Sequence, residues 1–167
     1  IIGDSPLHVA RGNGHTEVAM SLVEKGADVN ASRDEGHTPF HVACGNGHTE
    51  VAMSLIEKGA DMNISNIGGQ TPLDIACLNG RTEEAMALID KGADVNVRYM
   101  YGETPLHMAC ISGDTEIVMN LIDKGADMNA KDNDGCTPLY WACQEGRPGV
   151  AMALIENGAD MNASDND

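Results

Sequence analysis

The sequence predicts an all-α repeat solenoid, in which short helix-turn-helix units stack side by side and are joined by β-hairpin-like loops. The first observation is Ser/Thr-Pro-Leu/Phe followed by His, Asp or Tyr, which recurs five times every 33 residues and begins at Ser5, Thr38, Thr71, Thr104 and Thr137. The second is Gly-Ala-Asp-x-Asn, which recurs at the same spacing from Gly26, Gly59, Gly92, Gly125 and Gly158. A fixed period of this length is typical of stacked units, not of a domain folded around one central site.

Each unit is expected to begin with a short helix, as the second unit illustrates. The Thr38 hydroxyl can cap this helix, and Pro39 suits the first turn, where no backbone donor is needed. Apolar residues between positions 40 and 44 form the body of the helix. The Gly-Asn-Gly segment at 45–47 is expected to end it.

A second helix is expected to begin at His48 or Thr49. Glu50 in its first turn and Lys58 in its last turn both suit the helix dipole. Gly59 fits the left-handed residue that ends a helix, and the following residues predict an extended connection with a turn at Gly69. Neither short helix can bury its apolar face alone, so neighbouring units must cover it.

The phrase Thr-Pro-Leu-His with an alanine two residues later, then glycine and Gly-Ala-Asp-x-Asn, resembles the ankyrin repeat over essentially the whole chain. The resemblance implies a protein-binding module without catalytic activity. It also implies that the variable hairpin tips and first-helix ends form a concave binding face. We therefore expect one ankyrin domain, with units at about 1–32, 33–65, 66–98, 99–131 and 132–167.

The charge balance limits the partners that the chain could bind. With 26 acidic and 10 basic residues, the net charge is −16, which argues against nucleic acid and anionic membranes. No apolar run is long enough to span a membrane, and the first residues do not form a signal peptide. Because the chain lacks an initiator Met, we expect a processed, trimmed or excised piece. The acidity is either a solubilising surface or a preference for a basic partner.

The five cysteines are interpreted as structural thiols. Cys44, Cys77, Cys110 and Cys143 share one repeat position, and equivalent helices should lie about 8–10 Å apart, too far for easy disulfide pairing. Reduced thiols favour an intracellular setting, with the cytoplasm preferred. Cys136 is expected to be exposed at a hairpin tip.

No residue pattern predicts catalysis, a metal or a cofactor. The cysteines lack zinc-ligand spacing, and His37 and His41 are separated by a helix cap with no third ligand nearby. The chain has no phosphate-binding glycine loop and no nucleophile elbow. His8, His41 and His107 recur within the repeat phrase, and the resemblance implies framework hydrogen bonds for them.

The third hairpin tip is the predicted anchor for a partner protein. It holds two of the three tyrosines, and Leu78 and Ile111 stand where earlier units have Gly12 and Gly45. An apolar patch with an acidic rim would suit a partner with a basic or mixed basic and apolar surface. The alternative is that the tyrosines pack on neighbouring hairpins. The predicted partner-binding residues are Tyr99, Met100, Tyr101, Glu103, Leu78, Ile111, Ile67, Asp34, Glu35 and Asp134.

Three further features each have two interpretations. One methionine recurs in every second helix, either to fill gaps between helices or as an interface on the convex back: Met20, Met53, Met86, Met119 and Met152. Trp141 aligns with a row of apolar framework positions, so we expect it in the core rather than in an interface. The Asn of Asp-x-Asn stabilises the hairpin or, as in some ankyrin domains, is a hydroxylation site.

The two ends of the array predict different surroundings. Arg11 stands in the position of the later cysteines, which suits a polar N-terminal face. Val150, Met152, Leu154 and Ile155 remain as apolar as in an internal unit. We therefore expect the natural chain to continue past Asp167, or this face to pair with another molecule, including a second copy.

The leading functional hypothesis is a non-enzymatic scaffold that binds a protein on its concave face. The alternative is a regulatory or targeting segment of a larger enzyme or channel whose activity lies outside this chain. A designed binder fits the regularity, but the Met-rich and Cys-rich framework departs from an idealised consensus.

Overall fold

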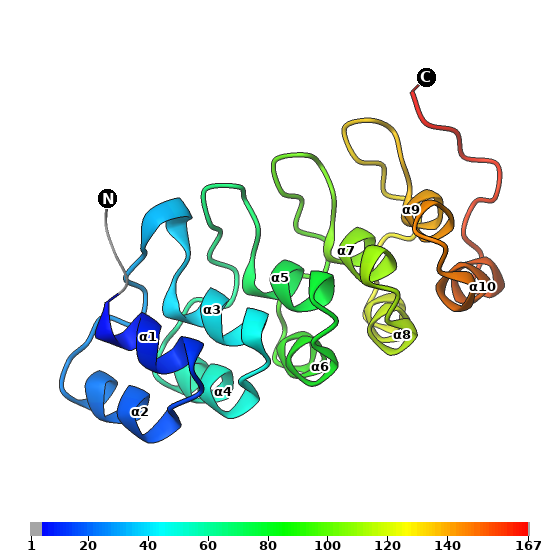
Figure 1. Cartoon of the computed structure of the whole chain (residues 1–167). Helices are drawn as coiled ribbons and strands as arrows, with labels where there is room; N and C mark the ends of the chain where they lie inside the picture. Colours follow the sequence, from blue (N-terminus) through cyan, green and yellow to red (C-terminus); the bar gives the residue numbers. More distant parts are fainter. Residues whose placement is uncertain (1–4, 167) are drawn as a thin grey trace.

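The computed structural model describes residues 5–166, apart from the side chain of Asp34. Helices of the described chain form two rows, and the hairpin loops project beyond the row of first helices (Figure 1). The first helices are α1 (Pro6–Gly12), α3 (Pro39–Asn46), α5 (Pro72–Leu78), α7 (Pro105–Ser112) and α9 (Pro138–Gln144). The second helices are α2 (Thr16–Glu24), α4 (Thr49–Glu57), α6 (Thr82–Asp90), α8 (Thr115–Asp123) and α10 (Pro148–Glu156). A short 3₁₀ turn, η1 (Asp34–Gly36), forms part of the first hairpin, and no strand is assigned within residues 5–166. The predicted all-α repeat solenoid is confirmed.

The repeated Ser/Thr-Pro phrase starts each first helix as predicted. The Thr38 hydroxyl accepts a hydrogen bond from the His41 backbone N–H, while the His41 ring accepts one from the Thr38 backbone N–H. This reciprocal cap also occurs at α1, α5 and α7. It satisfies two of the backbone donors that a helix N-terminus leaves unpaired.

The Gly-Asn-Gly segment at 45–47 ends the first helix of the second unit as predicted, although Gly45 itself lies inside the helix. Helix α3 continues to Asn46, and the left-handed residue is Gly47, with φ of 77°. A Cβ atom at Gly45 would lie 2.9 Å from the Ile75 side chain of the next unit. Glycine at this position therefore permits a close approach between α3 and α5 rather than a helix break.

The hairpin loops are closed by backbone bonds and are also joined to one another. At the third tip, Tyr99 N–H donates to the Glu103 carbonyl, and Gly102 N–H donates to the Tyr99 carbonyl. Single backbone bonds of 2.9–3.1 Å link successive tips, from Ile67 to Glu35, Met100 to Gly68, Asn133 to Tyr101 and Asn166 to Asp134. The tips therefore form one connected row along the array.

Side chains of the repeat framework join each unit to the next. The Nε2 atom of His41 donates to the Gln70 carbonyl at 3.1 Å, and equivalent bonds join His8 to His37 and His107 to Cys136. The side-chain oxygen of Asn96 accepts the Asp127 backbone N–H at 2.9 Å, and Asn30, Asn63 and Asn129 make the equivalent bond. These contacts support a framework role for the recurring histidine and asparagine.

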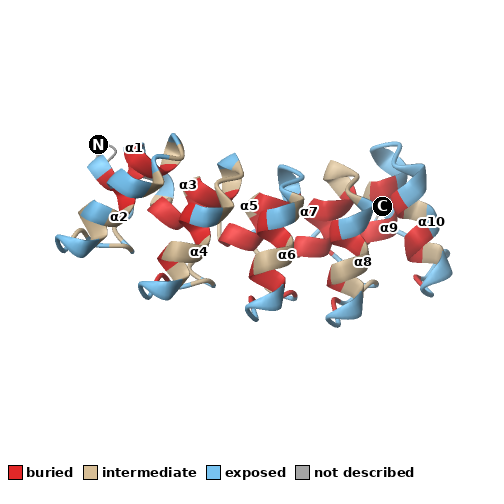
Figure 2. Ribbon diagram, turned by 90° about the horizontal axis from the view of Figure 1, so that it is seen from below, coloured by how far each residue is buried: buried red, intermediate tan, exposed pale blue. Residues whose placement is uncertain are grey.

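Most of the core is a continuous layer between the two rows of helices, shown in red in Figure 2. It runs from Phe40 to Ala159, while Leu7, Ala10 and Ala19 form a smaller cluster in the first unit. Neighbouring units cover one another's apolar faces, as the short helices require.

Three residues differ from the sequence-based prediction in how far they are buried. Arg11 is fully buried rather than part of a polar outer face, because it occupies the buried position of Cys44. Cys143 is exposed, since no following first helix in the described chain covers it. Cys136 is buried beneath the fourth hairpin, where its N–H donates to the Asp132 carboxylate at 2.8 Å.

Candidate protein-binding surface

The hairpin tips carry large apolar side chains that stand free of the core. Ile67 is 79% exposed, Met100 58% and Tyr101 59%. The backbone bond from Met100 to Gly68 places the second and third tips side by side. We call Ile67, Met100 and Tyr101 the tip patch.

Tyr99 has a supporting role beneath the tip patch. It is partly buried against the core, and its ring meets that of Tyr101 edge to face at 5.8 Å. Burial raises the pKa of its hydroxyl, and a side-chain hydrogen bond with Glu103 raises it further. Packing on the hairpin, the alternative to a binding role, therefore describes Tyr99 but not Tyr101.

The first-helix residues predicted to flank the patch lie at the ends of their helices. Leu78 is the last residue of α5 and is 38% exposed. Ile111 near the end of α7 is partly buried against the core. Leu78 therefore offers more surface to a partner than Ile111 does.

The predicted acidic rim is only partly exposed. Glu35 and Asp134 are exposed on the first and fourth tips, while the side chain of Asp34 lies outside the described part of the structure. Glu103 is only 9% exposed, so the prediction that it lies on the surface is wrong. Its hydrogen bond with Tyr99 holds it beneath the third tip.

Asp74 forms a second buried acidic group near Glu103. It replaces the framework histidine in the third unit, is fully buried, and accepts bonds from the Thr71 N–H and hydroxyl through Oδ2. Oδ1 of Asp74 and Oε2 of Glu103 have no hydrogen-bond partner within the described residues. Burial, with a smaller contribution from the Glu103 charge, raises the pKa of Asp74 to about 6.

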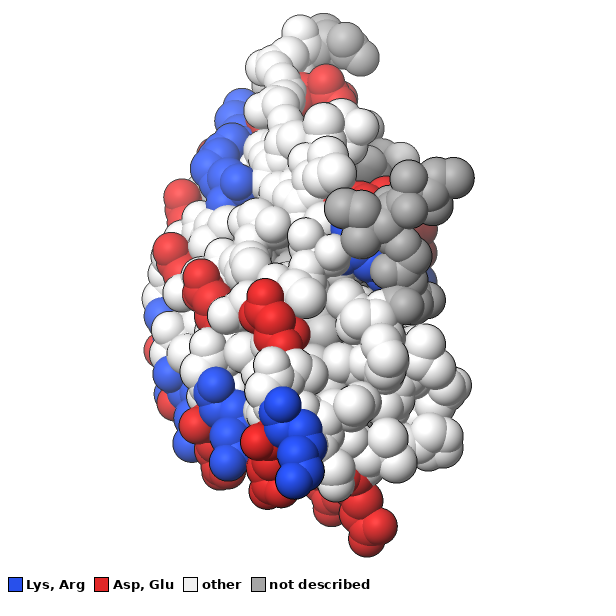
Figure 3. Space-filling view, turned by 90° about the vertical axis from the view of Figure 1, so that its left-hand side faces the viewer, with Lys and Arg blue, Asp and Glu red and all other residues white. Residues whose placement is uncertain are grey.

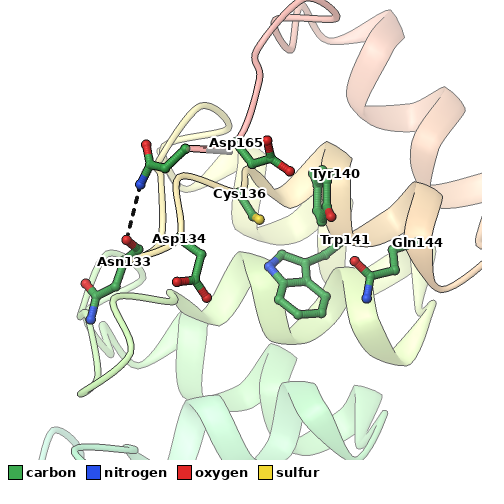
Figure 4. A pocket seen from close by; sticks show the side chains of 8 residues that line it. Asn133, Asp134, Cys136, Tyr140, Trp141, Gln144 and Asp165 are labelled. Atoms are coloured by element: carbon green, nitrogen blue, oxygen red, sulfur yellow. Dashed lines mark hydrogen bonds between the residues drawn. The ribbon is translucent and has the colours of Figure 1, made fainter.

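A pocket of about 410 Å³ opens at the fourth tip and was not predicted from the sequence (Figure 4). Tyr140 and Trp141 from α9 line it, together with residues of the fourth tip and of the segment after α10. Trp141 packs partly against the core, so its assignment to the core was only partly right. One signal in the sequence could have indicated this pocket: Tyr140 replaces the framework histidine and directly precedes the only tryptophan.

The recurring methionines pack between neighbouring second helices. Met20, Met53, Met86 and Met119 are partly buried, whereas Met152 in the last unit is 53% exposed. The Ser54 hydroxyl of α4 donates to the Met20 sulfur of α2 at 2.6 Å. This burial pattern favours gap filling over a convex interface.

Basic side chains lie in more than one part of the surface. Viewed along the array from its N-terminal end, some lie in rows beside acidic side chains at one edge, and others lie apart from these rows (Figure 3). Lys124 and Asp90 of neighbouring units form an ion pair at 3.0 Å. Acidic residues outnumber basic residues by 26 to 10, so the chain as a whole carries a net charge of −16.

The last unit exposes less apolar surface than its sequence suggests. Val150 and Leu154 are buried, whereas Met152 and Met161 are exposed. The apolar surface available there for self-association is therefore smaller than predicted.

The described residues provide no arrangement for metal binding. Residues 5–166 contain no group of three or more His, Cys, Asp or Glu side chains that could hold a metal ion. Burial lowers the pKa of His41 to about 4, which suits a neutral ring in a framework hydrogen bond. None of the described helices is long and apolar enough to cross a membrane.

Comparison with known proteins identifies the family. A family model described as "Ankyrin repeats (3 copies)" matches residues 7–99 and 98–165. A search of curated proteins gave no match. Ankyrin repeats are protein–protein interaction modules, and proteins built from them are typically non-enzymatic scaffolds. The match spans nearly all of the described chain, and the chain therefore belongs to the ankyrin-repeat family.

Proposed function

We propose that this chain is a non-enzymatic scaffold that binds another protein on the concave face formed by its hairpin tips and first helices. The observation that carries the proposal is the tip patch: Ile67, Met100 and Tyr101 are each more than half exposed on adjacent, hydrogen-bonded tips. Clustered apolar and aromatic side chains of this kind are typical anchors of protein interfaces.

The partner is proposed to carry basic and apolar groups. Exposed Glu35 and Asp134 lie on the tips either side of the tip patch, and the net charge of the chain is −16. Complementary charge at the rim would speed association and limit the choice of partner, while the apolar centre would supply affinity. An intracellular setting is proposed as well, supported by the burial of four free thiols.

The test compares two surface variants, each with three exposed apolar side chains replaced by serine, in a capture experiment from cell lysate. The first carries Ile67→Ser, Met100→Ser and Tyr101→Ser in the tip patch. The control carries Val18→Ser, Met152→Ser and Met161→Ser, which are 53–67% exposed at other places on the array. Tyr99 is left intact because it packs on the core.

The proposal predicts that proteins captured by the unmodified chain are lost by the tip-patch variant and retained by the control. Thermal unfolding of both variants checks that the array still folds. Retention by the tip-patch variant and loss by the control would contradict binding through the concave face.

A further inference from the structure

The pocket at the fourth tip is lined by groups that suit a cation. Asp134 and Asp165 stand on two sides of it, and the indole of Trp141 forms a wall between Asp134 and Gln144 (Figure 4). The volume of about 410 Å³ lies within the range of small-ligand sites, roughly 300–1,000 Å³. None of its eight lining residues is basic.

The tryptophan ring is fixed before any ligand arrives. Trp141 Nε1–H donates to Oδ2 of Asp132 at 2.9 Å, while Oδ1 of Asp132 accepts the backbone N–H groups of Asp134 and Cys136. Asp132 is only 7% exposed, so its charge is used inside the loop. The hydrogen bond turns the polar edge of the indole inward and leaves the ring as a preorganised wall.

The other two carboxylates remain directed at the pocket. Asp134 is exposed and Asp165 half-buried, and both lie near the buried Cys136 thiol, whose pKa they raise after the larger effect of burial. The cations that the structure places beside the fourth tip donate to backbone carbonyls: Lys131 Nζ to Ser164 at 2.9 Å, and Arg98 Nη2 to Lys131. The negative charge in the pocket is therefore available to a group from outside.

We propose that this pocket binds an arginine side chain of the partner protein, with the guanidinium against Trp141 and its N–H groups donating to Asp134 and Asp165. The proposal rests on the protein-binding function proposed above and names one residue type that the partner presents. A guanidinium is planar, stacks on aromatic rings, and donates several hydrogen bonds at once. A lysine ammonium is a compact, strongly hydrated charge and uses such a wall less well.

Trp141 also provides the readout, because it is the only tryptophan in the chain. Its fluorescence is followed while the full chain is titrated with the peptide acetyl-Gly-Arg-Gly-amide. Matched titrations use the same peptide with lysine, or with citrulline, which keeps the shape of arginine and lacks its charge. The variants are Asp134→Asn and Asp165→Asn, with Glu156→Gln at the exposed end of α10 as the control for net charge.

The expected result is a saturable change with the arginine peptide, a weaker one with lysine, and none with citrulline. Each Asp→Asn variant should weaken arginine binding about tenfold, the usual scale of a charge-assisted hydrogen bond. Glu156→Gln should leave the titration unchanged. Equal responses to arginine and citrulline, equal binding of arginine and lysine, or insensitivity to both Asp variants would overturn the assignment.

This titration needs no partner protein, so it separates the two proposals. If the chain captures a partner through the tip patch but its fluorescence is unaffected by the arginine peptide, only the pocket assignment fails. If the peptide binds in the pocket but no partner is lost by the tip-patch variant, only the proposed binding face fails.

Discussion

Replacing Asp74 by asparagine should stabilise the array at neutral pH. Asp74 is fully buried, and only one of its carboxylate oxygens has a hydrogen-bond partner within the described residues. The titratable groups around it are Glu103 and Tyr99 of the third hairpin and Cys77 of its own helix. None of these groups supplies a positive charge to stabilise an ionised Asp74.

The size of the effect follows from the pKa of this carboxyl. A value of about 6 in the folded chain, against an ordinary 3.8, means that the folded state binds the proton more tightly than the unfolded state. The resulting penalty is absent below the ordinary pKa, grows between the two values, and is complete above about pH 6. At roughly 1.36 kcal/mol for each pH unit, it reaches about 3 kcal/mol.

Asparagine keeps the oxygen that accepts both Thr71 hydrogen bonds and removes the buried charge. Asp74→Asn should therefore raise the free energy of unfolding by about 3 kcal/mol at about pH 7, and this gain should fade towards about pH 4.

Urea denaturation of both proteins across this pH range measures the difference. Asp123→Asn, an exposed position at the end of α8, is the control with the same change in net charge. A gain that is constant with pH, or a loss of stability at neutral pH, would refute the argument.

Three further predictions concern the framework. Arg11→Met should raise the unfolding free energy by about 1–4 kcal/mol, because the buried guanidinium has no hydrogen-bond partner within the described residues; a lower urea midpoint would contradict this. Asn96→Ala should lower the unfolding free energy by about 1–3 kcal/mol, because the Asp127 N–H and the Gly125 carbonyl of the next unit each lose their hydrogen bond to Asn96. An unchanged urea midpoint would show that these bonds do not couple the units. In a native thiol-labelling assay, Cys143 should react first, because the other four thiols are buried and the pKa of each is raised. Rapid labelling of Cys136 would show that the fourth hairpin opens.

The repeat period made most of the fold predictable from sequence. The start of α3 directly after its cap, Thr38, follows from local chemistry that each unit repeats. The left-handed Gly59, with φ of 87°, follows for the same reason. The close contact between Gly45 and Ile75 could not be predicted, because Ile75 belongs to another unit and the local sequence does not show which residues meet.

The ends of the array and the candidate sites were less predictable. Cys143 shares a repeat position with Cys44, but no following first helix of the described residues covers it. Cys136 is covered by the fourth hairpin, whose tip was expected to be open. The tip patch was found because tips vary between units. The pocket beside Trp141 could not be predicted, because Trp141 aligns with apolar framework positions. This alignment does not show that its ring also lines a cavity.

The proposed function requires a partner protein to contact the hairpin tips. Its most direct test is photo-crosslinking with benzoylphenylalanine placed at Ile67, the most exposed residue of the tip patch, and separately at Met152 on α10. Binding through the hairpin tips should give a crosslinked partner from position 67 and none from position 152. A partner crosslinked at position 152 but not at position 67 would contradict it.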